Sequence, residues 1–154
     1  MGERIEAVVT HHFSFPAERV FESWLRPDVI RQWMRAALQA MKLPGELGVI
    51  EVDARVGGQF CFSDKRPMGE AFHWGTYKLV DFPTGIAFTW NAGLQREKID
   101  DESSLVTIAI TPTEDGCDVR LVHSMDVQWR DYIERTKSGW HNMLVHIQGF
   151  LSKK

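Results

Sequence analysis

One stretch near the end of the chain, QWRDYIERTKSGWHNMLVHIQGFL at residues 128–151, shows the clearest periodic pattern in the sequence. Its apolar residues recur at the spacing of about 3.6 residues that places side chains on one face of an α-helix. The residues that share this face are Trp129, Ile133, Trp140, Leu144, Ile147 and Leu151, with Met143 beside them. The pattern predicts a long terminal helix that begins at about Gln128 and needs a partner for its apolar face.

The chain before this helix shows several period-two runs, in which side chains alternate between two faces as they do in β-strands. Turn signals separate neighbouring runs: Pro83-Thr84-Gly85 and Glu114-Asp115-Gly116 each predict a hairpin. The predicted strands cover residues 5–13, residues 47–52, a run that begins at Phe60, and residues 71–82, 86–90, 105–111 and 117–125.

Two short helices are predicted between the first two strands. Pro16 suits the start of a helix, where no amide hydrogen is needed, and Glu18 favours the first turn. Pro27 ends this helix and opens a second one, with Asp28 in its first turn, that continues to about Met41.

This order of elements predicts the α+β class. Sequential antiparallel strands must cover one face of their sheet, and the terminal helix carries a matching apolar face. We therefore expect a single domain over residues 1–154, because compact domains commonly have about 100–150 residues. In this domain a curved antiparallel sheet of about six to seven strands grips the long C-terminal helix, and the two short helices follow the first strand.

Composition and charge exclude several classes of function. The chain has 18 Lys and Arg against 21 Asp and Glu, a formal net charge of −3, so neither nucleic acid nor a membrane is predicted as a partner. No segment is long and apolar enough to span a bilayer, and the acidic start of the sequence is unlike a secretory leader. Cys61 and Cys117 form no close pair. We expect a cytoplasmic protein with free thiols, either a monomer or a homodimer.

The sequence lacks the motifs of several large enzyme classes. It contains no Gly-x-Ser-x-Gly turn, no phosphate-binding loop and no Gly-x-Gly-x-x-Gly dinucleotide motif. His141 and His146 lie about 140° apart around a helix, so they cannot bind one metal ion together. The acidic run 100–102 belongs to a charged segment, residues 95–102, that we interpret as a solvated loop. We therefore predict no cofactor and no metal site, and we assign no catalytic residue.

Three histidines on the predicted strands are expected to face inward. Strand parity places His11, His73 and His123 on the face that the terminal helix covers, with Tyr77 and Leu79 on the same side of the strand of His73. Two interpretations stay open. The histidines are buried residues whose nitrogens are satisfied by the backbone or water, or they provide a polar anchor or a general acid or base.

Taken in order, these elements resemble the START-like, or helix-grip, superfamily, which includes the birch-pollen allergen. The resemblance covers essentially the whole chain. Five short motifs are similar to landmarks of the family named for the heat-shock protein 90 ATPase activator: residues 15–21 (FPAERVF), 57–60 (GGQF), 75–77 (GTY), 88–90 (FTW) and 139–140 (GW).

The resemblance implies a cavity between the sheet and the terminal helix, which in this superfamily holds apolar or amphipathic small molecules. With the parity of the aromatic residues, it predicts that the chain binds a small hydrophobic molecule, lipid-like, polyketide-like or aromatic, without catalysis. Rings at these spacings are also typical of an ordinary core, so packing alone remains the other interpretation. The predicted ligand-binding residues are Trp33, Phe60, Phe62, His73, Tyr77, Phe88, Trp90, His123, Met125, Trp140 and Met143.

Two other functions stay open. Some members of the superfamily are cyclases, so a cyclase-like or hydrolytic enzyme that uses a cavity histidine is one alternative. The resemblance to the activator family implies the other, a cofactor that stimulates a chaperone ATPase through its surface. The eukaryotic activator itself acts together with a separate amino-terminal domain.

Overall fold

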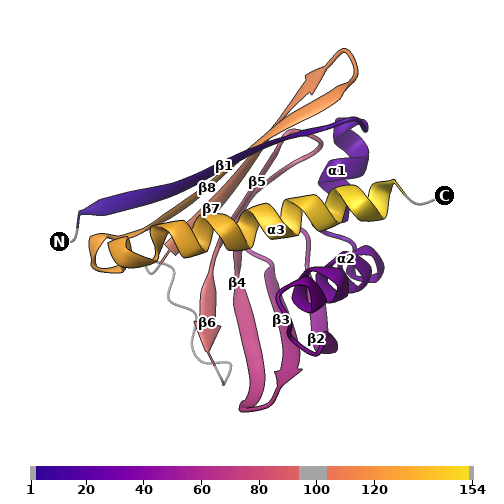
Figure 1. Ribbon diagram of the computed structural model, residues 1–154. Helices are drawn as coiled ribbons and strands as arrows, with labels where there is room; N and C mark the ends of the chain where they lie inside the picture. The colour runs from indigo at the N-terminus through magenta and orange to yellow at the C-terminus, as the bar shows by residue number, and fades with distance from the viewer. Residues whose placement is uncertain (1–2, 94–103, 153–154) are drawn as a thin grey trace.

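The computed structural model describes residues 3–93 and 104–152. The predicted loop 95–102, with its acidic run Asp100-Asp101-Glu102, lies outside these residues. The fold belongs to the predicted α+β class, with a long C-terminal helix across an antiparallel sheet (Figure 1). The elements are β1 Arg4–Phe13, α1 Ala17–Ser23, α2 Pro27–Ala40, β2 Glu46–Val52, β3 Gln59–Arg66, β4 Gly69–Asp81, β5 Gly85–Thr89, β6 Asn91–Gly93, β7 Ser104–Thr113, β8 Gly116–Asp126, the 3₁₀-helix η1 Val127–Tyr132 and α3 Ile133–Leu151.

Within the described ranges the sheet has eight strands in the order β1-β8-β7-β5-β4-β3-β2, with β6 beside β4. Every pairing is antiparallel, as predicted. The strand beyond the six to seven expected is β6, which has three residues and is separated from β5 by Trp90 alone. A run this short shows no period-two pattern of its own. Because β5 pairs with the second part of β4 and β6 with the first part, the chain bends at Trp90.

Helix α3 covers the sheet with the face that its periodicity predicts. Trp140, Leu144, Ile147 and Leu151 are all buried. The helix contacts β1 on one side and α2 on the other, and Figure 1 shows it in yellow, crossing in front of the strands. None of the helices within the described ranges is long and apolar enough to cross a membrane.

The start of the terminal helix differs from the prediction. Residues Val127–Tyr132 form a 3₁₀-helix, whose first turn is capped by the Asp126 carboxylate accepting the Gln128 amide hydrogen at 2.9 Å. A 3₁₀-helix turns about 120° per residue against about 100° in an α-helix, so side chains drift around the axis by about 80° over four residues. Trp129 therefore leaves the buried face and is 47% exposed, which corrects its predicted place on that face.

Prolines begin both short helices, as predicted. Pro16 is the N-cap of α1, and Pro27 occupies the first turn of α2. Helix α2 buries one face, which includes Trp33 and Met34. It is joined to α3 by the Asn142 side-chain amide, which donates a hydrogen bond of 3.0 Å to the Ala37 carbonyl. The two helices therefore border one side of the sheet together.

A β-bulge in β4 reverses the predicted orientation of one residue. The register with β5 shifts between Tyr77, which pairs with Phe88, and Leu79, which pairs with Ala87. Because the bulged strand has one extra residue there, parity no longer holds across it. Tyr77 is buried, whereas Leu79 is 41% exposed and does not face the helix.

Candidate ligand-binding site

An apolar hollow lies between the sheet and the helices, and we call it the aromatic pocket. The hollow has a volume of about 20 Å³, which is room for about one water molecule. Trp90 and Met143 are partly exposed and form its mouth, while the other lining residues are buried. The aromatic pocket is lined by Trp24, Trp33, Met34, Phe60, Phe62, Tyr77, Phe88, Trp90, Trp140 and Met143.

Simple periodicity positions most of these side chains. On β3, alternation turns Phe60 and Phe62 to the same face of the sheet, and the β4 register places Gly75 opposite Phe60 and His73 opposite Phe62. On α3, Trp140 and Met143 are three residues apart and therefore neighbours on one helix surface. The local sequence period thus determines the face to which each of these side chains points. The packing of α3 on the sheet then brings the side chains together.

Phe60 lies at the centre of the ring contacts from the sheet. Its ring centroid is 5.1 Å from that of Phe62, 5.4 Å from Tyr77, 5.2 Å from Phe88 and 5.9 Å from Trp90. These separations fall within the range of favourable offset and edge-to-face arrangements. The sheet side of the pocket is therefore one continuous aromatic surface.

Trp140 provides the helix side of the pocket. Its ring lies 5.0 Å from Trp90 and 6.5 Å from Phe88 on the sheet, and 6.3 Å from Trp24 at the end of α1. Trp24 also contacts Trp33 of α2, at 5.6 Å. Trp140 is thus the ring through which the sheet and helix sides of the pocket meet.

The indole N–H groups in the lining differ in their partners. Trp33 donates to the Ser23 carbonyl at 2.8 Å, and Trp140 donates to Nδ1 of His123 at 3.0 Å. The Nε1 of Trp24 is buried and has no hydrogen-bond partner among the described residues. A buried donor without an acceptor costs about 1–3 kcal/mol, so Trp24 is an unsatisfied polar group beside an apolar space.

Two histidines predicted for the site lie one contact away from the pocket. His123 is buried and accepts the Trp140 indole hydrogen, and His73 stacks on Trp90 with ring centroids 4.9 Å apart. Burial lowers the pKa of each to about 4, helped by Arg4 near His123 and Arg66 near His73. Both imidazoles are therefore neutral near pH 7, which makes them poor proton donors for catalysis.

The structure brings together most, but not all, of the residues that the sequence predicted for the site. Trp33, Phe60, Phe62, Tyr77, Phe88, Trp90, Trp140 and Met143 line the aromatic pocket. Met125 does not line it, although it is buried on β8, where it pairs with Ile5 of β1. His73 and His123 do not line it, although each contacts one of its tryptophans.

Two lining residues, Trp24 and Met34, were missing from the sequence prediction. Both stand in helical apolar patterns, Trp24 after Val20 and Phe21 and Met34 after Trp33, and such patterns indicate burial without saying what lies beside the buried side chain. The signal that could have found them is their residue type, because a tryptophan N–H and a flexible methionine suit a pocket wall.

The cysteine thiols lie outside the aromatic pocket. Cys117 and Cys61 are buried and are not joined in a disulfide, and burial raises the pKa of the Cys117 thiol to about 11, so it stays protonated. Within residues 3–93 and 104–152, no three His, Cys, Asp or Glu side chains are placed to hold a metal ion.

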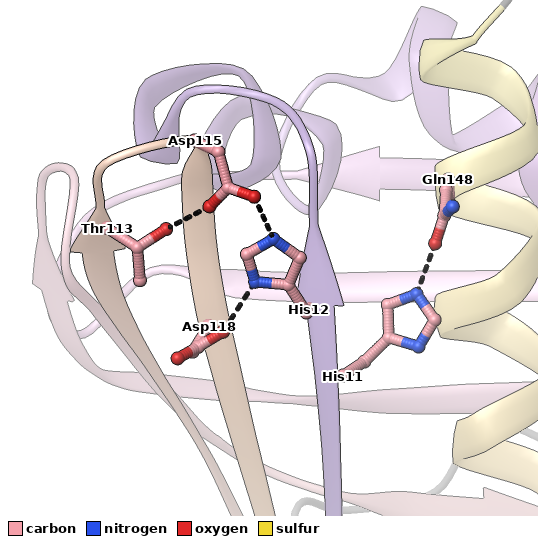
Figure 2. A network of polar contacts seen from close by, with 6 residues as sticks. All are labelled: His11, His12, Thr113, Asp115, Asp118 and Gln148. Carbon is pink, nitrogen blue, oxygen red and sulfur yellow. Dashed lines mark hydrogen bonds and ion pairs between the residues drawn. The ribbon is translucent and has the colours of Figure 1, made fainter.

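The adjacent histidines of β1, His11 and His12, point to opposite faces of the sheet (Figure 2). His11 faces α3, where its Nε2 is hydrogen-bonded to the Gln148 side-chain oxygen. His12 faces the β7–β8 turn, where Nδ1 lies 2.6 Å from Asp118 and Nε2 lies 3.3 Å from Asp115. His11 therefore serves the contact between α3 and β1, and it does not line the aromatic pocket.

His12 is expected to titrate above its ordinary pKa of 6.5. The hydrogen bond to Asp118 is the main cause, and the Asp115 carboxylate adds to it. Because the folded pKa is raised, the stabilisation from this contact is complete below pH 6.5 and is lost as the pH rises through the folded pKa. NMR titration of the His12 ring should show Asp118→Asn lowering its pKa, while Asp28→Asn on α2 leaves it unchanged. A His12 midpoint at or below 6.5 in the unaltered chain would contradict this assignment.

Comparison with known proteins places this architecture in a family. The profile described as activator of Hsp90 ATPase homolog 1-like protein matches residues 14–152, which includes nearly all of the chain. The chain belongs to this family. The match confirms the resemblance drawn from the five sequence motifs, and the family's solved relatives share the helix-grip arrangement.

Solved structures show the same fold at low sequence identity. A protein from Chromobacterium violaceum is 21% identical, with 99% of each chain covered and a TM-score of 0.74. An AHSA1-like protein from Aeromonas hydrophila is 20% identical over 96% of this chain and 92% of its own, with a TM-score of 0.73. A Staphylococcus aureus protein of unknown function is 16% identical over 97% and 94%, with a TM-score of 0.76. The search of curated proteins found no match.

Proposed function

We propose that this member of the family binds a small uncharged molecule with aromatic or apolar surface in the aromatic pocket, without catalysing a reaction. The observation that carries the proposal is the convergence of eight aromatic rings and two methionines, from both sheet and helices, on one hollow with a partly exposed mouth. Small-molecule sites are usually concave and lined by such side chains.

The size of the hollow determines how a ligand enters it. Since the space accommodates about one water molecule, a ligand with a ring needs lining side chains to move. Met34 and Met143 suit this role because methionine is unbranched and adopts several rotamers at low cost. Met143 also forms part of the mouth, so its rotation widens both the entrance and the hollow.

Filling the mouth is expected to block binding of an uncharged dye. N-phenyl-1-naphthylamine should gain fluorescence with the unaltered protein, and Met143→Trp should weaken its binding at least tenfold because the larger side chain occupies the hollow. Met143→Ala, which enlarges the hollow, should bind the dye at least as tightly as the original chain. Fluorescence titration gives the dissociation constants.

Met68→Trp is the matched control, because Met68 is 81% exposed and lies outside the pocket. It should leave dye binding unchanged, and circular dichroism should show all three variants folded. If the unaltered protein and Met143→Ala both fail to bind the dye, or if Met68→Trp and Met143→Trp weaken binding equally, the pocket is not the binding site.

The description of the family supports a second function, stimulation of a chaperone ATPase through the surface. An assay of chaperone ATP hydrolysis with and without this domain tests it directly. An enzyme that relies on a pocket histidine is the weaker alternative, because His73 and His123 each have a pKa of about 4 and a tryptophan between them and the hollow.

A further inference from the structure

Three buried tryptophans from the helical side line the aromatic pocket: Trp24 at the end of α1, Trp33 on α2 and Trp140 on α3. One of their three indole N–H groups has no hydrogen-bond acceptor among the described residues. Trp33 and Trp140 give their indole hydrogens to Ser23 and His123, so their orientations are fixed by protein acceptors. Trp24 contacts both of these rings, and its Nε1 has no acceptor in the described part of the chain. Trp74 Nε1 on β4 is also buried without a described acceptor, but of these two residues only Trp24 lines the aromatic pocket. Buried polar groups without a partner are uncommon in folded proteins and call for an explanation.

The uncharged lining of the pocket limits the class of ligand that could accept the Trp24 indole hydrogen. No charged side chain stands among its described lining residues, and Tyr77 remains a neutral phenol because burial raises its pKa. The neighbouring imidazoles of His73 and His123 are also neutral near pH 7. A bound ion would therefore have no counter-charge in the lining, and burying an unpaired charge is strongly unfavourable.

We propose that the aromatic pocket selects a neutral aromatic molecule that carries a hydrogen-bond acceptor oxygen, and that this oxygen accepts the indole hydrogen of Trp24. The inference rests on the proposed function and adds the chemical class of the ligand. The ring of the ligand would stack among the lining aromatics, and the acceptor would give Trp24 the partner that Ser23 and His123 give to the other two indoles.

An aromatic lining of this kind also occurs in sites for quaternary ammonium ions, where the ring faces attract the cation. A cation cannot accept a hydrogen bond, so it would leave the buried N–H of Trp24 unsatisfied. The lining also lacks a carboxylate among its described residues. An organic cation is therefore the competing outcome of the test.

Three probes of similar shape distinguish these cases: acetophenone, cumene, in which a methyl group replaces the carbonyl oxygen, and phenyltrimethylammonium. Because cumene leaves water more readily than acetophenone, the two affinities are compared after correction for the partition of each molecule between water and an apolar solvent. We expect the corrected affinity of acetophenone to be about tenfold higher than that of cumene, the effect of one hydrogen bond to an otherwise unpaired buried donor. NMR of the ¹⁵N-labelled indoles should show the Trp24 Nε1 hydrogen moving downfield with acetophenone and not with cumene. This measurement uses the unaltered chain and depends on no variant.

Substitution provides the second arm of the experiment. Trp24→Phe keeps an aromatic ring without the donor, so it should remove the advantage of acetophenone over cumene while cumene still binds. Trp129→Phe is the control, because Trp129 is exposed and lies outside the pocket. It should preserve the tenfold difference.

The outcomes separate the two proposals. Equal affinities of acetophenone and cumene after the partition correction, or an unmoved Trp24 resonance when acetophenone is bound, overturn the Trp24 inference and leave the pocket as a site for apolar molecules. Tighter binding of phenyltrimethylammonium than of acetophenone also overturns it, in favour of a cation site. If none of the three probes binds, the proposed function fails together with the inference that rests on it.

Discussion

Replacing Trp140 with alanine is expected to lower the free energy of unfolding by about 4 kcal/mol, because truncating a buried tryptophan removes its packing and leaves a cavity. Trp140 is 4% exposed and contacts rings on both sides of the pocket. The substitution also leaves Nδ1 of His123 without its donor. Its ring contacts join α3 to the sheet and to the end of α1.

Urea unfolding followed by circular dichroism measures this effect. Trp140→Phe separates the two contributions, since it keeps a ring and loses the indole N–H, and it should cost roughly 1–3 kcal/mol. Val145→Ala is the control on the same helix, because Val145 is 41% exposed, and its effect should stay within about 0.5 kcal/mol. A loss of less than about 2 kcal/mol for Trp140→Ala would show that the pocket rings pack loosely against α3.

Much of the fold could be predicted because local patterns of the sequence agree with the tertiary arrangement. Pro16 and Pro27 mark the starts of α1 and α2, and the apolar face of residues 140–151 is the face that packs on the sheet. The failures occur where backbone geometry departs from the ideal period. Trp129 leaves the buried face because its turn is 3₁₀, and Leu79 turns outward because of the bulge after Tyr77.

The sequence predicts which face of a strand or helix each residue of the candidate site occupies, and no more than that. Alternation and helical spacing indicate which face a side chain takes, and Phe60, Phe62 and Trp140 do lie on the face that lines the pocket. Neither period gives the position of a side chain along that face. Parity therefore predicts Met125 for the pocket, although this residue lies beside Ile5, near the end of β8.

The missed residues have a different cause. Trp24 was visible in the sequence as a buried helical residue, but the space left beside a buried side chain depends on how elements distant in sequence pack together. Trp24 borders the pocket because α3 brings Trp140 to within 6.3 Å of it. Contacts between residues more than 100 positions apart do not follow from local periodicity.

The motif Gly75-Thr76-Tyr77, one of those that carried the family resemblance, has a structural explanation at Gly75. The chain passes from β5 to β6 opposite this residue, and the backbone crosses close to its Cα atom. A Cβ atom at Gly75 would lie 1.9 Å from the Thr89 carbonyl oxygen and 2.7 Å from the carbonyl carbon. The Thr76 amide is held in the same place by the Thr89 hydroxyl at 2.9 Å, so the strands cannot move apart without breaking this contact.

Gly75→Ala is therefore expected to destabilise the protein by at least about 3 kcal/mol, the upper range for overpacking a well-packed interior, because backbone rather than a flexible side chain must yield. Gly139→Ala in α3 is the matched control: its Cβ would meet no atom within 4 Å, and alanine should stabilise the helix by about 0.5–1 kcal/mol. Urea unfolding compares the two variants. If Gly75→Ala proves as stable as the original chain, the β5–β6 bend can shift away from β4, and the position of Trp90 at the mouth of the pocket is then adjustable rather than fixed by the sheet.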